Sequence, residues 1–580
     1  MMSPLLGFPI FWLEAAMFEA ERAHLNRWLD EKRTNYFDSN PLLASLIARH
    51  GFGNADEYRA FAKVVQEVVD PAAMEDDRWW NHPRVERFDG VGNRREDVVF
   101  SPHNHRAGKP AYDAGIVACL EKPGSIRHQG VLFYLLGHCG EMGHLCPVTC
   151  TSGLVRALQA KGSKELKARW LPGLLTPRFG EALIGSQFLT EVQGGSDVGA
   201  NAVEAVPDTA FSGAYRLRGE KWFCSVAHAD LFLVTARPAG AAPGTKGLGC
   251  FLVPRKLDDG SANGFVVRRL KEKIGTRTLA TAEIDFDGAL GWPIGKIDEG
   301  FKIAVGIVLN TSRFMNALGA ASAMRRAYLE CVAFAKHREA FGHPIGRYPL
   351  VRETLAIMKA EEAAALTSTF ELAGLIDRID TGVAGDEEQA LYRLLVNANK
   401  YWTSVMCSDV VHRGIEIFGG NGTIETFSIL PRLYRDAIVL ESWEGSHNVL
   451  CMQVLKDAQK LGLIDAVDRR LRACVDSCTG ETASELPSRW AEILNALHLC
   501  RGDEAYAALH IKRHLESLMQ ATQVALLLEQ AQWEEARGEK TATAAIADFL
   551  FDRHLRVGYE PEEDSAYLEK IDAVLGADLG

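Results

Sequence analysis

The stretch Ser442-Trp443-Glu444-Gly445-Ser446 places one carboxylate beside an aromatic ring, and a helical pattern begins shortly after it, near residue 448. About 250 residues upstream, Thr190-Glu191-Val192-Gln193-Gly194-Gly195-Ser196-Asp197 follows a strand-like run. Its two adjacent glycines allow backbone amides to approach an anion closely, and Ser196 adds a donor. A tight turn with Asx chemistry also explains this second stretch. Neither stretch is decisive alone, so the segments between and around them set the interpretation.

The pattern around these two stretches predicts a mainly helical chain with one β-region. Apolar residues recur at helical spacing over 11–33, 55–69 and 154–171, with an irregular interruption at 82–109. Short strand-like runs separated by Gly, Pro and Asp occupy 182–189, 215–223, 231–235, 249–253, 264–267 and 282–286, which favours an antiparallel barrel or sandwich. Long helical patterns return at 303–338, 350–378, 387–417 and 448–460, as in a bundle, and continue at 485–499, 506–538 and 541–551.

We therefore expect four domains. They are an N-terminal helical domain over 1–182, a central β-domain over 183–298, a four-helix bundle over 299–460 and a helical extension over 461–580.

Composition excludes several classes of protein. The chain has 580 residues, 47% of them hydrophobic and 24% charged, as in ordinary globular proteins. No apolar run is long enough to span a membrane, and the apolar first 18 residues lack the basic start of a secretory signal. The twelve cysteines show no short disulfide spacing, which favours a reducing, cytoplasmic compartment.

Charge argues against a nucleic-acid partner. The formal net charge is -12, and residues 456–580 hold 14 Lys or Arg against 23 Asp or Glu, a net of -9. Phosphate binding requires the opposite sign.

Three further segments carry candidate binding residues, each with a plain structural alternative. Trp222, in Lys221-Trp222-Phe223-Cys224-Ser225, either walls a conjugated ring or lies in the core. Arg338-Glu339-Ala340-Phe341-Gly342 offers a phosphate fork and an aromatic cover, or a simple helix end. Glu416-Ile417-Phe418-Gly419-Gly420-Asn421-Gly422 has more glycines than a plain turn needs.

Nucleotide and metal motifs of other kinds are weak or missing. The sequence has no Gly-x-Gly-x-x-Gly after a strand and no Walker-type motif. Thiols and imidazoles gather at His138, Cys139, His144, Cys146 and Cys150, but without a Cys-x-x-Cys pair. Buried small residues explain this group better than a metal site does, and we predict no metal.

Taken in order, these segments resemble the acyl-CoA dehydrogenase family over roughly residues 183–455. The series is Thr-Glu-x-x-x-Gly-Ser-Asp, Trp on a strand, Arg-x-x-Phe-Gly, Phe-Gly-Gly-Asn-Gly and Arg-Asp-x(7)-Glu-Gly. Residues 193–197, 431–435 and 443–446, with the C-terminal extension, are most similar to the branch that contains the alkylation-response flavoprotein AidB. The resemblance implies a helical domain, a β-barrel and a four-helix bundle, with FAD between the last two.

The resemblance also assigns roles to individual residues. It makes Glu444 the catalytic base and places Asn310, Ser312, Arg313 and Ser196 near the substrate. Residues 187–196 would line the flavin ring, with Thr190 on its pyrimidine edge. The full set implied for FAD is Gln187, Leu189, Thr190, Ser196, Trp222, Phe223, Cys224, Arg338, Phe341, Glu416, Gly419, Gly420, Ser446 and Asn448. The residues from Arg338 onward to Gly420 would hold the FAD of a neighbouring protomer, which implies a homodimer or homotetramer.

Several positions depart from the family pattern. Cys224 stands where Thr or Ser commonly donates to flavin N5, and Pro349 where Gln often contacts the adenosine. Asn310 replaces a frequent Asp. Ser312 occupies the alternative base position of some branches, so Glu444 has no competitor.

The expected function is FAD-dependent α,β-dehydrogenation of an acyl-CoA in fatty acid metabolism, with an electron-transfer flavoprotein as acceptor. One alternative is an AidB-like protective protein that binds DNA and has little dehydrogenase activity, which the acidic C-terminal region disfavours. Another is a flavin monooxygenase or oxidase on the same fold, whose chemistry does not need Glu444.

Overall fold

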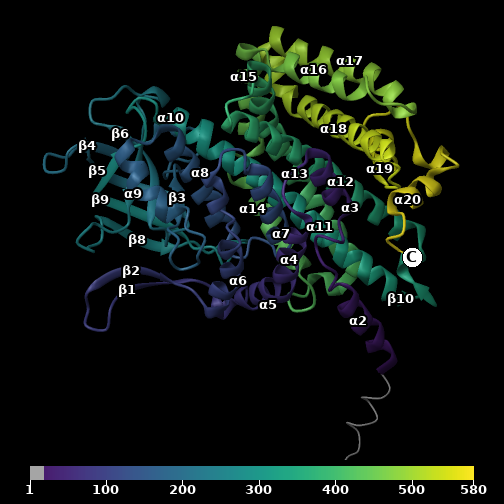
Figure 1. Ribbon diagram of the computed structural model, residues 1–580, viewed down its shortest axis with the longest axis horizontal. Helices are drawn as coiled ribbons and strands as arrows, with labels where there is room; N and C mark the ends of the chain where they lie inside the picture. Colours follow the sequence, from purple (N-terminus) through teal and green to yellow (C-terminus); the bar gives the residue numbers. More distant parts are fainter. Residues whose placement is uncertain (1–18, 580) are drawn as a thin grey trace, which may run out of the picture.

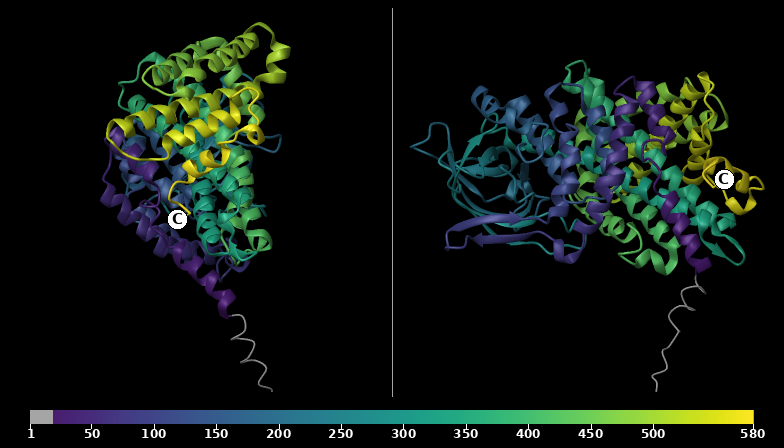
Figure 2. Two further views of the ribbon diagram at one scale, coloured as in Figure 1. Left: turned by 90° about the vertical axis from the view of Figure 1, so that its right-hand side faces the viewer. Right: turned by 60° about the horizontal axis from the view of Figure 1, so that its bottom comes forward.

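The computed structural model describes residues 19–579, so the beginning of the helix predicted over 11–33 lies outside the described residues. In this part of the chain no helix is long and apolar enough to cross a membrane. A helical body holds the β-domain at one end, and the C-terminal helices cover the opposite side of the bundle (Figures 1 and 2).

The N-terminal region is mainly helical. Its helices are α2 (Glu19–Glu31), α3 (Pro41–His50), α4 (Ala55–Val64), α5 (Asp70–Asp76), α6 (Pro102–Asp113), α7 (Ile126–Gly137), α8 (Leu145–Lys161) and α9 (Lys164–Leu174). The single helix predicted over 154–171 is wrong: Gly162 ends α8 and the Ser163 side chain caps α9 by accepting from the amide of Leu166.

The irregular segment predicted over 82–109 is also wrong, since it forms a hairpin and a helix. Strands β1 (Arg84–Phe88) and β2 (Arg94–Val99) pair antiparallel, and α6 follows at once. Charged residues dominate both strands, so their alternation carries little apolar signal; Val85 and Val98 pack against the core of the β-domain.

The central strands close into a barrel. They are β3 (Gly185–Phe188), β4 (Glu204–Pro207), β5 (Tyr215–Ser225), β6 (Leu231–Pro238), β7 (Gly249–Pro254), β8 (Phe265–Leu270) and β9 (Thr281–Pro293). The order is β3-β6-β4-β5-β9-β7, and β7 also pairs with β6, which closes the sheet. The central β-domain was predicted, but not β4; pairing is mostly antiparallel, except that β3 and β4 each run parallel to β6.

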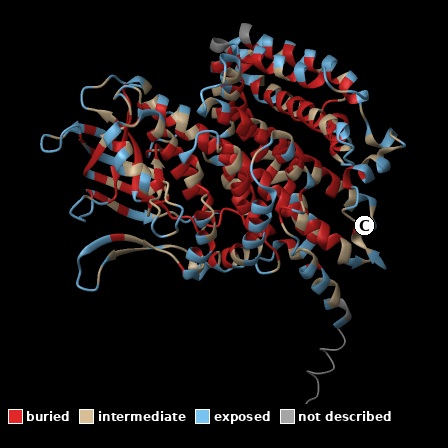
Figure 3. Ribbon diagram, viewed as in Figure 1, coloured by how far each residue is buried: buried red, intermediate tan, exposed pale blue. Residues whose placement is uncertain are grey.

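The helical bundle carries the core that supports the site. It contains α10 (Gly300–Ile303), a wider helical segment (Ala304–Leu309), α11 (Asn310–His337), α12 (Pro349–Asp380), α13 (Asp386–Phe418), α14 (Leu430–Ser442) and α15 (His447–Leu461), with the short pair β10 (Glu339–Ala340) and β11 (His343–Pro344) at its far end (Figure 1). Buried residues run almost continuously along α11, α12 and α13 (Figure 3). Helix α14, which the sequence patterns did not predict, leads directly into Glu444.

The extension packs on the bundle. Its helices are α16 (Leu463–Val475), α17 (Glu481–Gly502), α18 (Glu504–Ala536), α19 (Thr543–His554) and α20 (Tyr567–Leu575). Helix α18 contacts α12 and α13, α16 contacts α13, and α20 contacts α12. The boundaries at 182, 298 and 460 stay our proposal for the division into domains.

Candidate active site

Glu444 lies in a tight turn between α14 and α15. Helix α14 ends at Ser442, Trp443 is extended, and Glu444 then adopts a left-handed conformation with φ 59°. Gly445 follows with φ 108°, and Ser446 is the first residue before α15. A left-handed non-glycine residue costs about 1–2 kcal/mol and is uncommon outside functional sites. The turn therefore holds the Glu444 carboxylate in a conformation that the chain would not choose locally.

Two polar side chains bind Glu444 directly. Gln187, on β3, donates through Nε2 to both carboxylate oxygens at 3.2 and 3.3 Å, and to Ser312 Oγ at 3.0 Å. Arg313 Nε, on α11, donates to the Glu444 carbonyl at 3.0 Å. Glu444 is thus bound from both the β-domain and the bundle.

The pKa of Glu444 is raised. Burial is the dominant cause and outweighs the opposing charges of Arg313 and Lys400 and the hydrogen bond from Gln187, so that the pKa lies at about 7. A carboxyl group with this pKa can exchange a proton near neutral pH.

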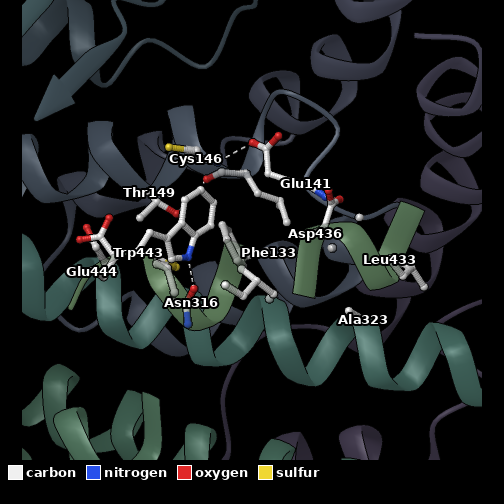
Figure 4. Close-up of a pocket in the computed structure, with 17 residues that line it drawn as sticks. Phe133, Glu141, Cys146, Thr149, Asn316, Ala323, Leu433, Asp436, Trp443 and Glu444 are labelled. Atoms are coloured by element: carbon white, nitrogen blue, oxygen red, sulfur yellow. Dashed lines mark hydrogen bonds between the residues drawn. The ribbon is translucent and has the colours of Figure 1, made fainter. Parts of the chain in front are cut away.

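An apolar cavity extends from Glu444 into the protein (Figure 4). Its walls come from α7, α8, α11 and α14, and Trp443 lies across it with its indole N–H donated to Asn316. The other end is formed by Leu433, Glu141 and Asp436. The lining residues are Phe133, Gly137, Gly140, Glu141, Leu145, Cys146, Thr149, Ser312, Met315, Asn316, Gly319, Ala323, Leu433, Asp436, Leu440, Trp443 and Glu444.

A second group of predicted residues lies on and after β3 and on β5 of the barrel, near Gln187. Leu189 is buried, whereas Thr190 and Trp222 are partly exposed and Phe223 is 53% exposed. The Trp222 amide donates to the Thr190 carbonyl at 2.9 Å, which ties the two segments together. A Cβ atom at Gly195 would lie 2.5 Å from Thr190 Oγ1, so a larger residue here would force the Thr190 side chain to move.

This part of the barrel fits a flat aromatic cofactor. It presents the exposed ring of Phe223 beside a glycine turn, while Lys271 Nζ lies 3.6 Å from the centre of the Trp222 ring. Cys224, on the same strand as Trp222, is completely buried, and burial raises the pKa of its thiol well above the usual range. Its S–H group is at most a weak hydrogen-bond donor.

The third group of predicted residues is exposed and remote from the cavity. Arg338, Phe341, Glu416, Gly419 and Gly420 lie at the far ends of α11 and α13, beside β10. The rings of Phe334 and Phe418 stack there at 4.1 Å, which brings the two helix ends together. Within one chain these residues do not meet Glu444, as expected if they serve a neighbouring protomer.

Most of the remaining predicted residues lie on α11 or at the start of α15, on either side of Glu444. Asn310 Oδ1 accepts from Arg313 at 3.1 Å, and Ser312 lines the cavity. Ser446 and Asn448 are exposed at the start of α15, and Ser196 is exposed on the glycine turn. The sequence analysis did not predict Lys400 or the residues of the cavity wall. Lys400 could have been noticed as a single lysine among the buried residues of α13.

The two histidines of the group considered for a metal each have one ring nitrogen close to a backbone carbonyl. His138 Nδ1 lies 2.9 Å from the Tyr134 carbonyl and His144 Nε2 2.9 Å from that of Asn104. Within residues 19–579 no group of three or more His, Cys, Asp or Glu side chains could hold a metal ion.

Sequence comparison identifies the family. Residues 298–459 match the acyl-CoA dehydrogenase C-terminal domain, 186–289 the acyl-CoA dehydrogenase middle domain and 26–181 the AidB N-terminal domain. The putative acyl-CoA dehydrogenase AidB of Escherichia coli is 32% identical over 456 residues, which cover 75% of this chain and 80% of that protein. The chain belongs to the acyl-CoA dehydrogenase family. The predicted resemblance, including its AidB branch, is confirmed.

Solved structures agree with this membership. Caenorhabditis elegans ACDH-11 in complex with C11-CoA is 25% identical, with a TM-score of 0.82 over 93% of this chain and 94% of that one. An acyl-CoA dehydrogenase from Bacillus anthracis complexed with FAD is 19% identical, covers 93% of this chain and 90% of that one, and has the same fold with a TM-score of 0.70. The predicted fold class is confirmed, and FAD is confirmed as cofactor at the level of the family. Membership of this family also supports an oxidoreductase.

Proposed function

We propose that this chain is an acyl-CoA dehydrogenase that uses FAD to introduce a double bond between the α- and β-carbons of an acyl thioester. The observation that carries the proposal is Glu444, a carboxylate with a pKa of about 7 at one end of an apolar cavity. The complex of ACDH-11 with C11-CoA supports the substrate class.

The protein groups divide the work as follows. The apolar walls bind the acyl chain and expel water, which keeps the pKa of Glu444 high until the α-carbon is in place. The Glu444 carboxylate then removes the α-proton, and its backbone amide polarises the thioester carbonyl. When bound, FAD supplies the acceptor for the hydride lost from the β-carbon. Gln187, itself hydrogen-bonded to Ser312, holds the carboxylate, and Arg313 holds the backbone carbonyl of Glu444.

The residues proposed for FAD are those of the two remaining groups. Gln187, Leu189, Thr190, Trp222, Phe223 and Cys224 would line the flavin ring of their own chain. Ser196 would contact the pyrophosphate, and Ser446 and Asn448 would also approach the FAD. Arg338, Phe341, Glu416, Gly419 and Gly420 would meet the adenosine and pyrophosphate of a second protomer, so we propose a homodimer or homotetramer. Electron-transfer flavoprotein as acceptor, a role in fatty acid metabolism and a cytoplasmic location belong to the same proposal.

The test is anaerobic mixing of the FAD-loaded protein with a panel of acyl-CoAs while the visible flavin band is followed. Medium and long chains should bleach the band, because the cavity runs from Glu444 to Leu433 between largely apolar walls. If no thioester bleaches it, the proposal is wrong, and rapid reaction of chemically reduced enzyme with oxygen would then favour an oxidase or monooxygenase.

Glu444→Gln should lower the rate of bleaching about 10²- to 10⁴-fold while FAD stays bound, since the amide cannot accept the α-proton. Glu492→Gln is the control. This glutamate forms an exposed pair with Arg489 on α17 and does not line the cavity. Normal bleaching by Glu444→Gln would show that another group is the base.

A further inference from the structure

Lys400 is an unusual residue in the centre of the bundle. It lies on α13, its side chain is completely buried, and its neighbours Ala398, Tyr401 and Trp402 are buried apolar residues. Lysine is almost never fully buried without a paired carboxylate, because removing an ammonium group from water is costly. Among the described residues no carboxylate lies within 4 Å of Lys400 Nζ.

The ammonium group of Lys400 donates instead to two backbone carbonyls. The distances from Nζ are 3.1 Å to the Glu441 oxygen and 3.0 Å to the Gly445 oxygen. These two carbonyls flank Trp443 and Glu444 on either side. Arg313 Nε binds the carbonyl of Glu444 itself at 3.0 Å. Two buried cations from different helices thus hold three carbonyls within one five-residue turn.

This arrangement has a mechanical consequence. The left-handed conformation of Glu444 is unfavourable locally, so contacts around it must maintain it. Helix α14 ends immediately before the turn, and the carbonyls at its end lack partners within the helix. Lys400 donates a hydrogen bond to the Glu441 carbonyl at the end of α14 and another to the Gly445 carbonyl. The two hydrogen bonds fix the turn at both ends.

It also has an electrostatic consequence. The charged and titratable groups that face Lys400 are Arg313 on α11, Glu441 on α14, and Glu444 and His447 in and after the turn. Burial lowers the pKa of Lys400 to about 7, although Glu444 and Glu441 oppose this shift. Conversely, the charge of Lys400 lowers the pKa of Glu444 against the effect of burial. The two groups therefore favour each other's charged forms.

We propose that Lys400 is the positioning residue of the Glu444 turn: it clamps the carbonyls of Glu441 and Gly445 and stabilises the ionised carboxylate that accepts the α-proton. Only one part of this inference rests on the proposed function, namely that the ionised carboxylate accepts the α-proton of a substrate. The clamp and the charge coupling belong to the protein with or without substrate.

The experiment replaces Lys400 by Met, which keeps the length of the side chain and removes its charge and hydrogen bonds. In the FAD-loaded protein, Lys400→Met should slow acyl-CoA-dependent bleaching about tenfold or more at pH 7. It should also move the pH midpoint of the bleaching rate upward by about one unit, because the carboxyl of Glu444 loses a neighbouring positive charge. Lys400→Arg should restore most of the wild-type midpoint.

Two measurements make the result independent of turnover. Infrared titration of the Glu444 carboxyl, with its band assigned by its loss in Glu444→Gln, should show the same upward shift. Hydrogen exchange should be faster in the 441–448 segment of Lys400→Met and unchanged elsewhere. If acyl-CoAs fail to bleach wild-type protein, the proposed function fails, but these two measurements still test Lys400.

Lys359→Met is the matched control, because Lys359 on α12 also donates to a backbone carbonyl, that of Leu575, and to Asp578. It should change stability without moving the Glu444 titration. A folded Lys400→Met protein with wild-type midpoint and wild-type exchange in 441–448 would overturn the proposal. If Lys400→Met does not fold, an unchanged infrared titration in Lys400→Gln, which keeps a donor but no charge, would overturn it equally.

Discussion

At the scale of single residues, the proton affinity of Glu444 reflects opposing effects of similar size. Burial raises its pKa, and Arg313, Lys400 and Gln187 lower it, with a result of about 7. Gln187 is the member of this set that reaches the carboxylate oxygens directly. A hydrogen bond from an amide stabilises the ionised form, so its removal must raise the pKa further.

We therefore expect the second-order rate of flavin bleaching by acyl-CoA to rise with pH and to level off above a midpoint near 7, because only the ionised carboxylate accepts a proton. Gln187→Leu should move this midpoint upward. Gln453→Leu is the control, since Gln453 on α15 donates to Asp457 and does not contact Glu444. A midpoint that stays in place in Gln187→Leu would contradict the assignment of Gln187.

At the scale of elements, α11 forms the long wall of the cavity. Ser312, Met315, Asn316, Gly319 and Ala323 recur at helical spacing and face the cavity together. Gly319 leaves free space there, since a Cβ atom at this position would meet Phe133 at 3.7 Å and Leu145 at 4.0 Å, both ordinary contact distances.

Gly319→Ala should raise the free energy of unfolding by about 1 kcal/mol, because glycine is unfavourable within a helix. Gly319→Leu should in addition fill the cavity and shift the preference of flavin bleaching towards shorter acyl chains. Gly130→Ala in α7 is the control: it has similar free space at 3.6–4.0 Å but does not line the cavity. Thermal unfolding measures the change in stability, and the panel of acyl-CoAs measures the change in chain-length preference. Equal chain-length profiles for Gly319→Leu and wild type would place the acyl chain elsewhere.

The sequence predicted many elements of the molecule but missed others, among them α7, α14, α16 and β4. Helices α12 and α13 and six barrel strands follow from long apolar periodicity or from turn residues between short runs. Helix α14 escaped because buried polar residues such as Arg432 and Asp436 interrupt its apolar face. Strand β4 escaped because three of its four side chains are not buried and its sequence, Glu-Ala-Val-Pro, carries little pattern.

At the scale of the whole molecule, charged side chains join the extension to the rest of the protein. Arg470 on α16 binds Glu371 on α12 at 2.7 Å and Glu529 on α18 at 2.8 Å. Arg49 on α3 binds the same Glu529 oxygen at 2.9 Å. Burial acts to raise the pKa of Glu529, yet the two guanidinium groups hold it at about 2.

Because the folded pKa of Glu529 lies below the ordinary value of 4.5, its contribution to stability is complete above pH 4.5 and disappears as the pH falls towards 2. Glu529→Gln should therefore lower the free energy of unfolding at pH 7 by about 1–3 kcal/mol, with a smaller difference from wild type below pH 4. Denaturant titrations at several pH values measure this. Glu492→Gln, in an exposed pair with Arg489, should change stability by less than about 0.5 kcal/mol. A pH-independent difference would show that Glu529 acts through packing alone.

By itself, the sequence determined the order of the helical and β regions, the family, the cofactor and the candidate base, because short motifs at fixed spacing and apolar periodicity are properties of the chain. It also placed Gln187, Ser312, Arg313 and Glu444 in one site, through the resemblance that those motifs carry. Only the tertiary structure decided what surrounds that site. Periodicity shows that a helix face is buried but not which face opposes it, so the cavity between α7, α8, α11 and α14 could not be read from any one segment. Lys400 gained its meaning in the same way, since its partners on the far side of the turn become neighbours only when α13 and α14 pack together.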